Sequence, residues 1–464
     1  MNSLPTSDQV STSNGKVFRP YWNPSVKGRS GNLWLPTKTG CQDLGSNLLD
    51  GLSSSMMENS WFSIDLKVQP NRNLRETCSP SYMSSLVGFM DLESTVVRSR
   101  KIRAYLNAEQ RQIYKQVVGI SRYTYNETVK LLKDGRRVDK KGIKTEVVGN
   151  LPDWSKLAPY QVKAYAAFDA CKAVSSAKKK CKSLGKPQDV GFRSRKDSVQ
   201  SIGVPKSAVK RDGIYITVFG KIKYAEDFEK KVGTVQHDCR MICDNGRYYL
   251  VVPVERHTKC PENQRAGIVA LDPGVRTFQT FYSEQLVGKV GAADMGRIQR
   301  LCYHLDRLMS KIPRANHKRK YRLKKAATRL RFKIKNLISE IHKKLALFLV
   351  RNFDVVVIPE FETQQMASNL SSRNARSMYT WAHYSFRRFL KEKCEEYSTM
   401  YVEQCEAYTS KTCSSCGQLH EIGKKKTLSC SCGCKIDRDI NGARGIFLRA
   451  LEDNPSIEAF LSGA

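Results

Sequence analysis

The chain has 464 residues, more than one ordinary hydrophobic core can hold, so about two to four domains are expected. Its 79 lysines and arginines exceed its 44 acidic residues and give a formal net charge of +35. This excess favours a polyanionic partner, nucleic acid before an anionic membrane, because no apolar run could span a bilayer and no signal peptide opens the chain.

The cysteines argue against a disulfide scaffold. There are 15 of them, an odd number; ten are scattered and five gather between residues 413 and 434. This pattern predicts a reduced intracellular protein with one metal site.

The first half of the chain predicts an arm, helices and a β-rich module. Residues 1–60 are rich in Ser, Asn, Gly and Pro and predict a flexible arm. Asn107-Ala-Glu-Gln110 has the pattern of a capping box that opens a helix, and a second helix is expected from Pro159. In residues 190–256, Tyr215–Phe219 alternates as a strand would, and Asn245-Gly246 supplies the turn of a hairpin.

The second half predicts a mixed α/β core. Apolar strands lead to Asp272, to Glu360 and to Glu406, and a further acid, Asp439, precedes Asn441 and a helical tail. A return strand over 276–282, a helical region over 295–350 and a helix over 381–396 lie between them. Acids at strand ends converge on one sheet edge, where several carboxylates can bind divalent cations for phosphodiester hydrolysis.

The helical region carries an unusual charge pattern. From Lys318 to Lys335, ten of eighteen residues are Lys or Arg and none is acidic, whereas solvated helices usually mix both signs. We expect this face to contact a polyanion through Lys318, Arg319, Lys320, Arg322, Lys324, Lys325, Arg329, Arg331 and Lys333.

The C-terminal cysteines predict a structural zinc site, because four thiolates form a closed tetrahedral site. Cys413 and Cys416 have the usual CxxC spacing. Cys430 and Cys432 are one residue tighter than usual, and Cys434 is an alternative ligand. His420 is a weaker candidate and is expected at the surface.

These strings together resemble the transposon-encoded TnpB nucleases and, more closely, their eukaryotic relatives, the Fanzor proteins; type V CRISPR nucleases share the same core. The resemblance covers about residues 100–450. It rests on Leu106–Gln110 with Arg122–Asn126, Gly267–Gly274, Tyr408–Gly417, Cys432-Gly433 and Asp437–Ala443.

The resemblance implies a multidomain α/β and α+β protein built around an RNase H-like RuvC core. Its expected parts are the N-terminal arm (1–60), a β-barrel wedge domain (61–104 and 188–258), a helical recognition domain (105–187), the RuvC nuclease domain (262–411 and 436–464) and a zinc-finger insertion (412–435).

The resemblance also implies an RNA-guided DNA endonuclease. Such an enzyme binds a transposon-derived guide RNA (omega RNA) and cleaves complementary double-stranded DNA. Its expected cofactors are two Mg²⁺ ions, for which Mn²⁺ can substitute, and one structural Zn²⁺. We expect no membrane contact and no obligate protein partner. A nuclear location follows from the eukaryotic resemblance and from basic clusters such as His317–Lys320.

The second catalytic acid departs from the family pattern. Relatives usually have Glu-Asp-Leu after the middle strand, whereas this chain has Pro359-Glu360-Phe361. Many Fanzor proteins use a displaced Glu before the zinc knuckle, which matches Glu406. The resemblance therefore implies a catalytic, Mg²⁺-binding set of Asp272, Glu406 and Asp439, with Glu360 as the alternate second acid.

Two competing functions remain open at this point. One is a guide-independent transposase or resolvase-like enzyme on the same RNase H-like fold. The other is a catalytically inactive nucleic-acid-binding regulator, which Pro359 favours because it stands where the family has its Glu.

Overall fold

The computed structural model describes residues 61–68, 95–259, 267–292, 294–361, 363–368, 370–405, 408–421, 423, 425–455 and 457. The chain divides into two compact units. The middle unit is Asp91–Thr258, and the large unit combines Met1–Met90 with Lys259–Ala464. The predicted arm over residues 1–60 lies outside the described residues.

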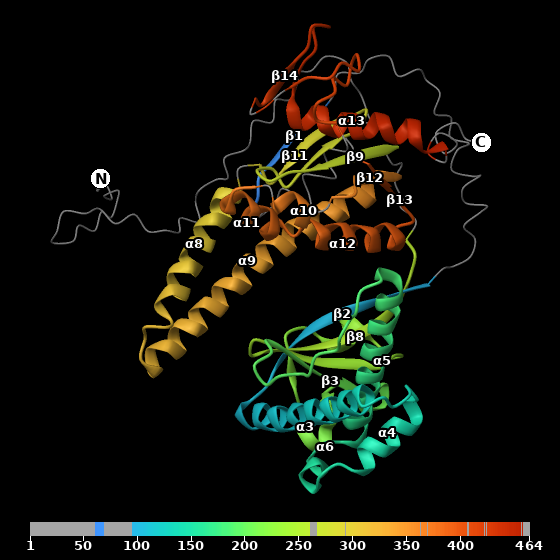
Figure 1. The fold of residues 1–464 in the computed structure, drawn as a ribbon, viewed down its shortest axis with the longest axis vertical. Coiled ribbons are helices and arrows are strands. Elements are labelled where there is room, and N and C mark those ends of the chain that lie inside the picture. Colours follow the sequence, from blue (N-terminus) through green and yellow to red (C-terminus); the bar gives the residue numbers. More distant parts are fainter. Residues whose placement is uncertain are drawn as a thin grey trace, which may run out of the picture. The chain divides into compact units, whose positions relative to one another are not determined.

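The middle unit contains a five-stranded antiparallel sheet in the order β3-β7-β8-β2-β6 (Figure 1). Its strands are β2 (Thr95–Tyr105), β3 (Val199–Val204), β6 (Lys223–Tyr224), β7 (Cys239–Asp244) and β8 (Arg247–His257). A small second hairpin pairs β4 (Val209–Lys210) with β5 (Gly213–Ile214). The β7–β8 hairpin confirms the predicted turn, because Asn245 and Gly246 have φ angles of 49° and 81°.

Helices accompany this sheet: α3 (Ala108–Lys133), α4 (Lys140–Gly149), α5 (Tyr160–Leu184), α6 (Ile216–Phe219) and α7 (Phe228–Val232). The capping box predicted at α3 is present, with both Asn107 and Gln110 bonded to the reciprocal backbone N–H. The Tyr114 side chain of α3 is buried against β7 and donates its hydroxyl to Met241 O at 3.3 Å.

The strand predicted for Tyr215–Phe219 is wrong. Tyr215 adopts a left-handed conformation with φ 42°, and Ile216–Phe219 forms the short helix α6. The apolar side chains still reach the core, because Phe219 is buried with Ile214 and Ile222. An alternating pattern this short fits one helical turn as well as a strand.

The large unit contains a six-stranded mixed sheet in the order β1-β11-β10-β9-β12-β13. Its strands are β1 (Ile64–Val68), β9 (Ile268–Pro273), β10 (Gln279–Tyr282), β11 (Leu286–Val290), β12 (Val355–Pro359) and β13 (Met400–Gln404). From β1 to β9 the neighbours are antiparallel, whereas β9, β12 and β13 are parallel. The predicted mixed α/β core is confirmed.

Strand β1 corrects one predicted boundary. The resemblance places residues 61–104 in the β-barrel wedge domain, but Ile64–Val68 pairs with Val290–Leu286 of β11 in the large unit. The sequence marks Ile64–Val68 as a strand by its apolar residues, but pairing partners depend on contacts more than 200 residues apart.

Helices cover both faces of the large sheet (Figure 1). One face packs against α13 (Arg438–Asp453), and its core includes Ile268, Ala270, Val357, Ile446 and Phe447. The other face packs against α9 (His317–Asn352) and α12 (His383–Glu396), around residues such as Val269 and Leu271. Two shorter helices, α10 (Thr363–Ser368) and α11 (Ser372–Trp381), precede α12.

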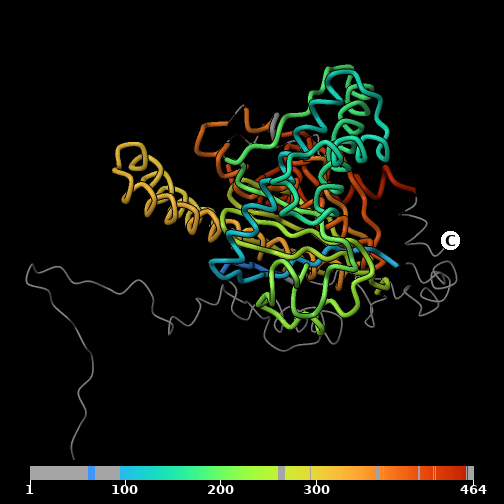
Figure 2. Tube along the Cα trace, turned by 90° about the horizontal axis from the view of Figure 1, so that it is seen from below, coloured from blue at the N-terminus to red at the C-terminus, as the bar shows by residue number. Residues whose placement is uncertain are grey.

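Helices α8 (Met295–Lys311) and α9 pack side by side as a long hairpin. Its tip extends well beyond the sheet of the large unit in both views (Figures 1 and 2). A small hairpin of β14 (Thr427–Ser429) and β15 (Lys435–Asp437) precedes α13. Across the described residues, none of the helices has the length and apolar character needed to cross a membrane.

Candidate metal centre

Asp272 lies near the end of β9, on the face of the sheet that α13 covers. Strand pairing places it beside Thr280, which pairs with Lys289, which in turn pairs with Asp65. Residues paired across adjacent strands point to the same face. Asp65, Lys289, Thr280 and Asp272 therefore form one lateral row across four strands.

Helix α13 approaches Asp272 closely at a glycine. A Cβ atom placed on Gly442 would lie only 2.7 Å from Asp272 Oδ2. The start of α13 and the end of β9 therefore come together in space, although Gly442 follows Asp272 by 170 positions in the sequence. This proximity joins two acidic motifs that the sequence analysis placed in one site.

Asp437 has a structural role at the start of α13. It is the N-cap residue, and its Oδ1 accepts hydrogen bonds from Asp439 N–H at 3.0 Å and Ile440 N–H at 3.4 Å. The same oxygen is 2.7 Å from the ammonium of Lys289. A carboxylate with these three donors anchors the helix N-terminus to β11.

Asp439 lies in the first turn of α13, and its side chain is 49% exposed. Its Oδ2 is 3.6 Å from Lys289 Nζ, a longer contact than that of Asp437. Asp439 therefore keeps much of its carboxylate accessible next to the row that ends in Asp272.

The two predicted second acids are placed differently. Glu406 lies outside the described residues. Glu360 follows β12 and is exposed, and its backbone N–H donates to Gln404 O at 3.2 Å. On β12, Val355 and Val357 face α13. Pleat alternation then gives Pro359 the same face, whereas Glu360 lies beyond the last residue of the strand.

The predicted cysteines form one cluster. The sulfur atoms of Cys413, Cys416, Cys430 and Cys432 all lie within 4.8 Å of one another. Cys413 and Cys432 are 3.8 Å apart, and Cys416 and Cys430 are 3.4 Å apart. A tetrahedral site with Zn–S bonds of 2.3 Å requires sulfurs about 3.8 Å apart. The geometry therefore fits one Zn²⁺ ion.

Cys434 plays a different part in this region. It packs beside Cys413 and Leu428 in a small apolar core, and its carbonyl accepts from Cys430 N–H at 2.9 Å. This hydrogen bond closes the turn that presents Cys430 and Cys432. Gly433 completes the turn with a φ of 84°.

Local donors favour thiolate character at Cys430. The backbone N–H of Cys432 is the main group that lowers the Cys430 pKa, to about 6. His420 Nε2 lies 3.1 Å from Cys430 Sγ, so His420 supports a thiolate of the cluster from a half-buried position. A lowered pKa favours the deprotonated form that binds metal.

Asn441 connects the cysteine cluster to α13. Its side chain is fully buried, accepts from Ser414 N–H at 3.1 Å and donates to Thr412 O at 2.7 Å. Ser414 lies inside the first CxxC. One amide therefore fixes the cysteine loop relative to the helix that carries Asp439.

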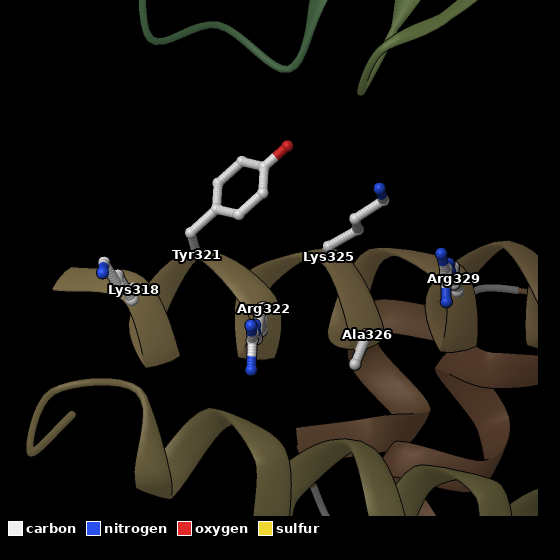
Figure 3. A pocket seen from close by; sticks show the side chains of 6 residues that line it. All are labelled: Lys318, Tyr321, Arg322, Lys325, Ala326 and Arg329. Atoms are coloured by element: carbon white, nitrogen blue, oxygen red, sulfur yellow. The ribbon is translucent and has the colours of Figure 1, made fainter. Parts of the chain in front are cut away.

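The basic residues of α9 form an exposed face. Lys318, Tyr321, Arg322, Lys325, Ala326 and Arg329 line a shallow groove, shown in Figure 3. Tyr321 and Lys325 project on the same side of the helix, and Tyr321 is 65% exposed. Among the described residues, no basic side chain from Lys318 to Lys333 forms an ion pair, so these charges stay available to an anionic partner.

Lys289 is the charged residue of this region that the sequence analysis did not identify. The segment Leu286–Val290 reads Leu-Val-Gly-Lys-Val, an apolar stretch with one charge. A lysine inside an otherwise apolar strand needs a partner, because burying an unpaired charge is costly. The sequence therefore indicates that Lys289 needs an acidic partner, but it does not show which acid that is.

Comparison with known proteins relates part of the chain to one domain model. Residues 383–446, which include α12, β13, the cysteine cluster and the start of α13, match the Cas12f1-like TNB domain. This match covers the cysteines and Asp439 but not Asp272.

Two viral proteins are similar over longer stretches. A candidate transposase of Paramecium bursaria Chlorella virus 1 is 29% identical over 398 residues, or 79% of this chain and 90% of that protein. A TnpB-like protein of Acanthamoeba polyphaga mimivirus is 30% identical over 247 residues, or 50% of this chain and 46% of that protein.

Among solved structures, a Cas12f1–sgRNA–target DNA complex aligns over 78% of this chain and 99% of that chain, with 12% identity and a TM-score of 0.45. By sequence, the chain is similar to a viral transposase and to TnpB-like proteins, and one region of it is similar to the Cas12f1-like TNB domain.

Proposed function

We propose that the protein is an RNA-guided DNA endonuclease with a RuvC-like active site, related to the Fanzor proteins. The observation that carries the proposal is the contact between Asp272 and the start of α13, which joins the two most specific acidic motifs of the chain. The TnpB-like relatives and the Cas12f1-like region support the same function.

The sheet of the large unit supports an RNase H-like core. Counting β9 to β13 as strands one to five, their order across the sheet is 3-2-1-4-5, with the first three antiparallel and the last two parallel to the first. This mixed arrangement supports the RNase H-like RuvC core that the resemblance implies, with Asp272 near the end of β9. We assign the RuvC nuclease domain to residues 262–411 and 436–464.

Asp272, Glu406 and Asp439 would bind the divalent cations, because carboxylate oxygens are the ligands that Mg²⁺ and Mn²⁺ prefer. Two bound Mg²⁺ ions would activate a water and stabilise the leaving oxygen of the phosphodiester. Glu406 is preferred to Glu360, because it matches the displaced Glu of Fanzor proteins and because Glu360 lies beyond the end of β12. Asp437 would not bind the metal, because it caps α13 and pairs with Lys289.

Cys413, Cys416, Cys430 and Cys432 would hold one structural Zn²⁺, and Cys434 would close the turn between the last two ligands. The metal would stabilise the insertion over residues 412–435. Asn441 would then transmit its position to Asp439, two residues away on the same helix.

The guide RNA would account for the +35 charge, because each phosphate contact releases counterions. The basic face of α9 is the best candidate contact, since 33 consecutive residues from Arg307 to Ser339 contain no acid. The antiparallel sheet and helices of the middle unit would serve as the wedge and recognition domains. Double-stranded DNA would be the substrate and the nucleus the site of action.

The test is to purify the protein with its bound RNA, sequence that RNA and incubate the complex with matched and mismatched DNA in Mg²⁺. The proposal expects one structured RNA and cleavage of matched DNA only. Cleavage without RNA would favour the transposase or resolvase alternative. RNA binding without cleavage in Mg²⁺ or Mn²⁺ would favour an inactive regulator, the alternative that Pro359 supports.

A further inference from the structure

The ammonium group of Lys289 lies between two carboxylates at the start of α13. Its Nζ atom is 2.7 Å from Asp437 Oδ1 and 3.6 Å from Asp439 Oδ2. The Lys289 side chain is 18% exposed, compared with 37% for Asp437 and 49% for Asp439. The cation is therefore more enclosed than either acid with which it pairs.

The position of Lys289 in the sheet determines its distance from Asp272. Lys289 lies on β11 between β1 and β10, paired with Asp65 on one side and Thr280 on the other. Adjacent strands are about 4.8 Å apart, so Lys289 is two strand spacings from Asp272 on the same face. A small recess of about 100 Å³, lined by Asp65, Lys67, Lys289 and Asp437 among others, adjoins it.

We propose that Lys289 is a specificity-determining residue of the carboxylate site: its ammonium competes with a divalent cation for Asp439. The proposal rests on the function proposed above, in which Asp272 and Asp439 bind the metal. A metal at Asp439 would lie a few ångströms from a like charge, which lowers its affinity. Lys289 therefore raises the metal concentration at which the site fills.

Asp437 keeps this competitor in place. Its Oδ1 already accepts two backbone N–H groups of α13, and the ammonium is the third donor on the same oxygen. When metal binds Asp439, Lys289 keeps its shorter contact to Asp437 and gives up the longer one. The ammonium is thus displaced from one carboxylate without losing its partner.

Competition of this kind discriminates by charge. A monovalent ion brings no more charge than the ammonium, which is already tethered to the strand. A divalent ion gains about twice the attraction from the same carboxylates and can displace it. Lys289 would therefore exclude monovalent cations and require a divalent one.

The test measures Mn²⁺ binding directly, from the electron paramagnetic resonance signal of free Mn²⁺, with the zinc cluster loaded beforehand. Lys289→Gln removes the charge but can still donate to Asp437. We expect it to lower the Mn²⁺ concentration at half-saturation at least about fivefold. Lys289→Arg keeps the charge and should stay within about twofold of the native protein.

Lys67→Gln is the matched control, because Lys67 lines the same recess and the change in net charge is identical. It should leave Mn²⁺ binding within about twofold, since the ion pairs of Asp437 and Asp439 within the described residues are with Lys289. Unchanged or weaker Mn²⁺ binding in a folded Lys289→Gln variant overturns the proposal.

Asp439→Asn and Asp272→Asn distinguish a failure of the proposed role of Lys289 from a failure of the proposed carboxylate site. If Asp439→Asn and Asp272→Asn both leave Mn²⁺ binding intact, the carboxylate site itself is wrongly assigned. If they abolish binding while Lys289→Gln does not tighten it, the site stands and the role of Lys289 fails. Melting temperatures of all variants show that each comparison is between folded proteins.

Discussion

The side-chain amide of Asn441 accepts a hydrogen bond from the Ser414 backbone N–H at 3.1 Å, across 27 residues of chain. It also donates to Thr412 O at 2.7 Å and to Thr409 O at 3.4 Å, and it is fully buried. Asn441 therefore links the helix that carries Asp439 to the loop that carries Cys413, beside a longer contact from Arg444 to Ser415 Oγ at 3.5 Å. Damage to the cluster should reach the carboxylate site through this amide.

Asn441→Ala should destabilise the large unit by about 2 to 4 kcal/mol, because it leaves buried backbone groups unpaired. Asn441→Asp should cost at least as much: it keeps an acceptor for Ser414 N–H, but its buried carboxylate would face Thr412 O, to which the amide donates. Denaturant unfolding measures both. Asn352→Ala is the control: within the described residues the Asn352 side chain bonds to Phe348 O of its own helix, and its loss should cost less than about 1 kcal/mol. Equal costs at the two asparagines would contradict this account.

Replacing one ligand should release the zinc, whereas replacing its neighbour should not. Cys432→Ser removes a sulfur of the four-cysteine cluster, and Cys434→Ser removes one outside it. We expect zinc content, measured by mass spectrometry of the purified protein, to fall from about one per chain to well below half in Cys432→Ser only. If Cys434→Ser lost zinc and Cys432→Ser retained it, Cys434 would be the ligand and Cys432 would not.

Acid should weaken the large unit through a buried histidine pair. His342 and His383 each stack on the Phe278 ring, with centroids 5.0 and 5.4 Å apart from it. Burial lowers the pKa of His342 to about 4 and that of His383 to about 3. The folded protein therefore holds both rings neutral at pH values where an unfolded chain would protonate them.

The direction of the pH dependence of stability follows from how many protons the folded and unfolded states bind. Below the unfolded pKa of 6.5 the unfolded state takes up protons that the folded state refuses, so stability falls as pH drops from 6.5 toward 4. For His342 alone the loss between about pH 7 and about pH 5 is about 2 kcal/mol. His342→Gln should remove that share of the pH dependence of unfolding. The exposed His304→Gln should not, and equal slopes in both variants would refute the assignment.

The basic face of α9 should bind nucleic acid through its charges. Changing Lys318, Arg322, Lys325 and Arg329 to Gln should weaken RNA binding and reduce the slope of log affinity against log salt by roughly 3. Exchanging Lys for Arg and Arg for Lys at the same four positions keeps the charge and should leave the slope intact. An unchanged slope in the Gln variant would place the RNA elsewhere.

Local patterns predicted the elements that carry the site. The strand that carries Asp272 is predicted by its apolar run, and the α3 capping box is predicted because it lies within four residues. Local patterns could not predict what those elements pair with. Lys289 meets Asp437 across 148 residues, and β1 joins β11 across more than 200. Such contacts depend on strand register, which no short window of sequence contains.

The choice of cysteine ligands likewise could not be predicted from short stretches of sequence. The sequence left Cys430, Cys432 and Cys434 open because all three have plausible spacing. The hydrogen bond from Cys430 N–H to Cys434 O and the left-handed Gly433 decide which sulfurs meet Cys413 and Cys416. Tyr215–Phe219 failed for a related reason, because one positive φ converts an alternating pattern into a helical turn.

We propose that Asp272 and Asp439 form the active site of an RNA-guided nuclease. The most direct test of this claim is cleavage of guide-matched DNA in Mg²⁺ by the native ribonucleoprotein and by Asp272→Ala and Asp439→Ala, each shown to retain RNA and zinc. We predict cleavage by the native complex and a loss of at least about a thousandfold in each variant. Cleavage that persists in either variant, or native protein that leaves matched DNA intact, would contradict the claim.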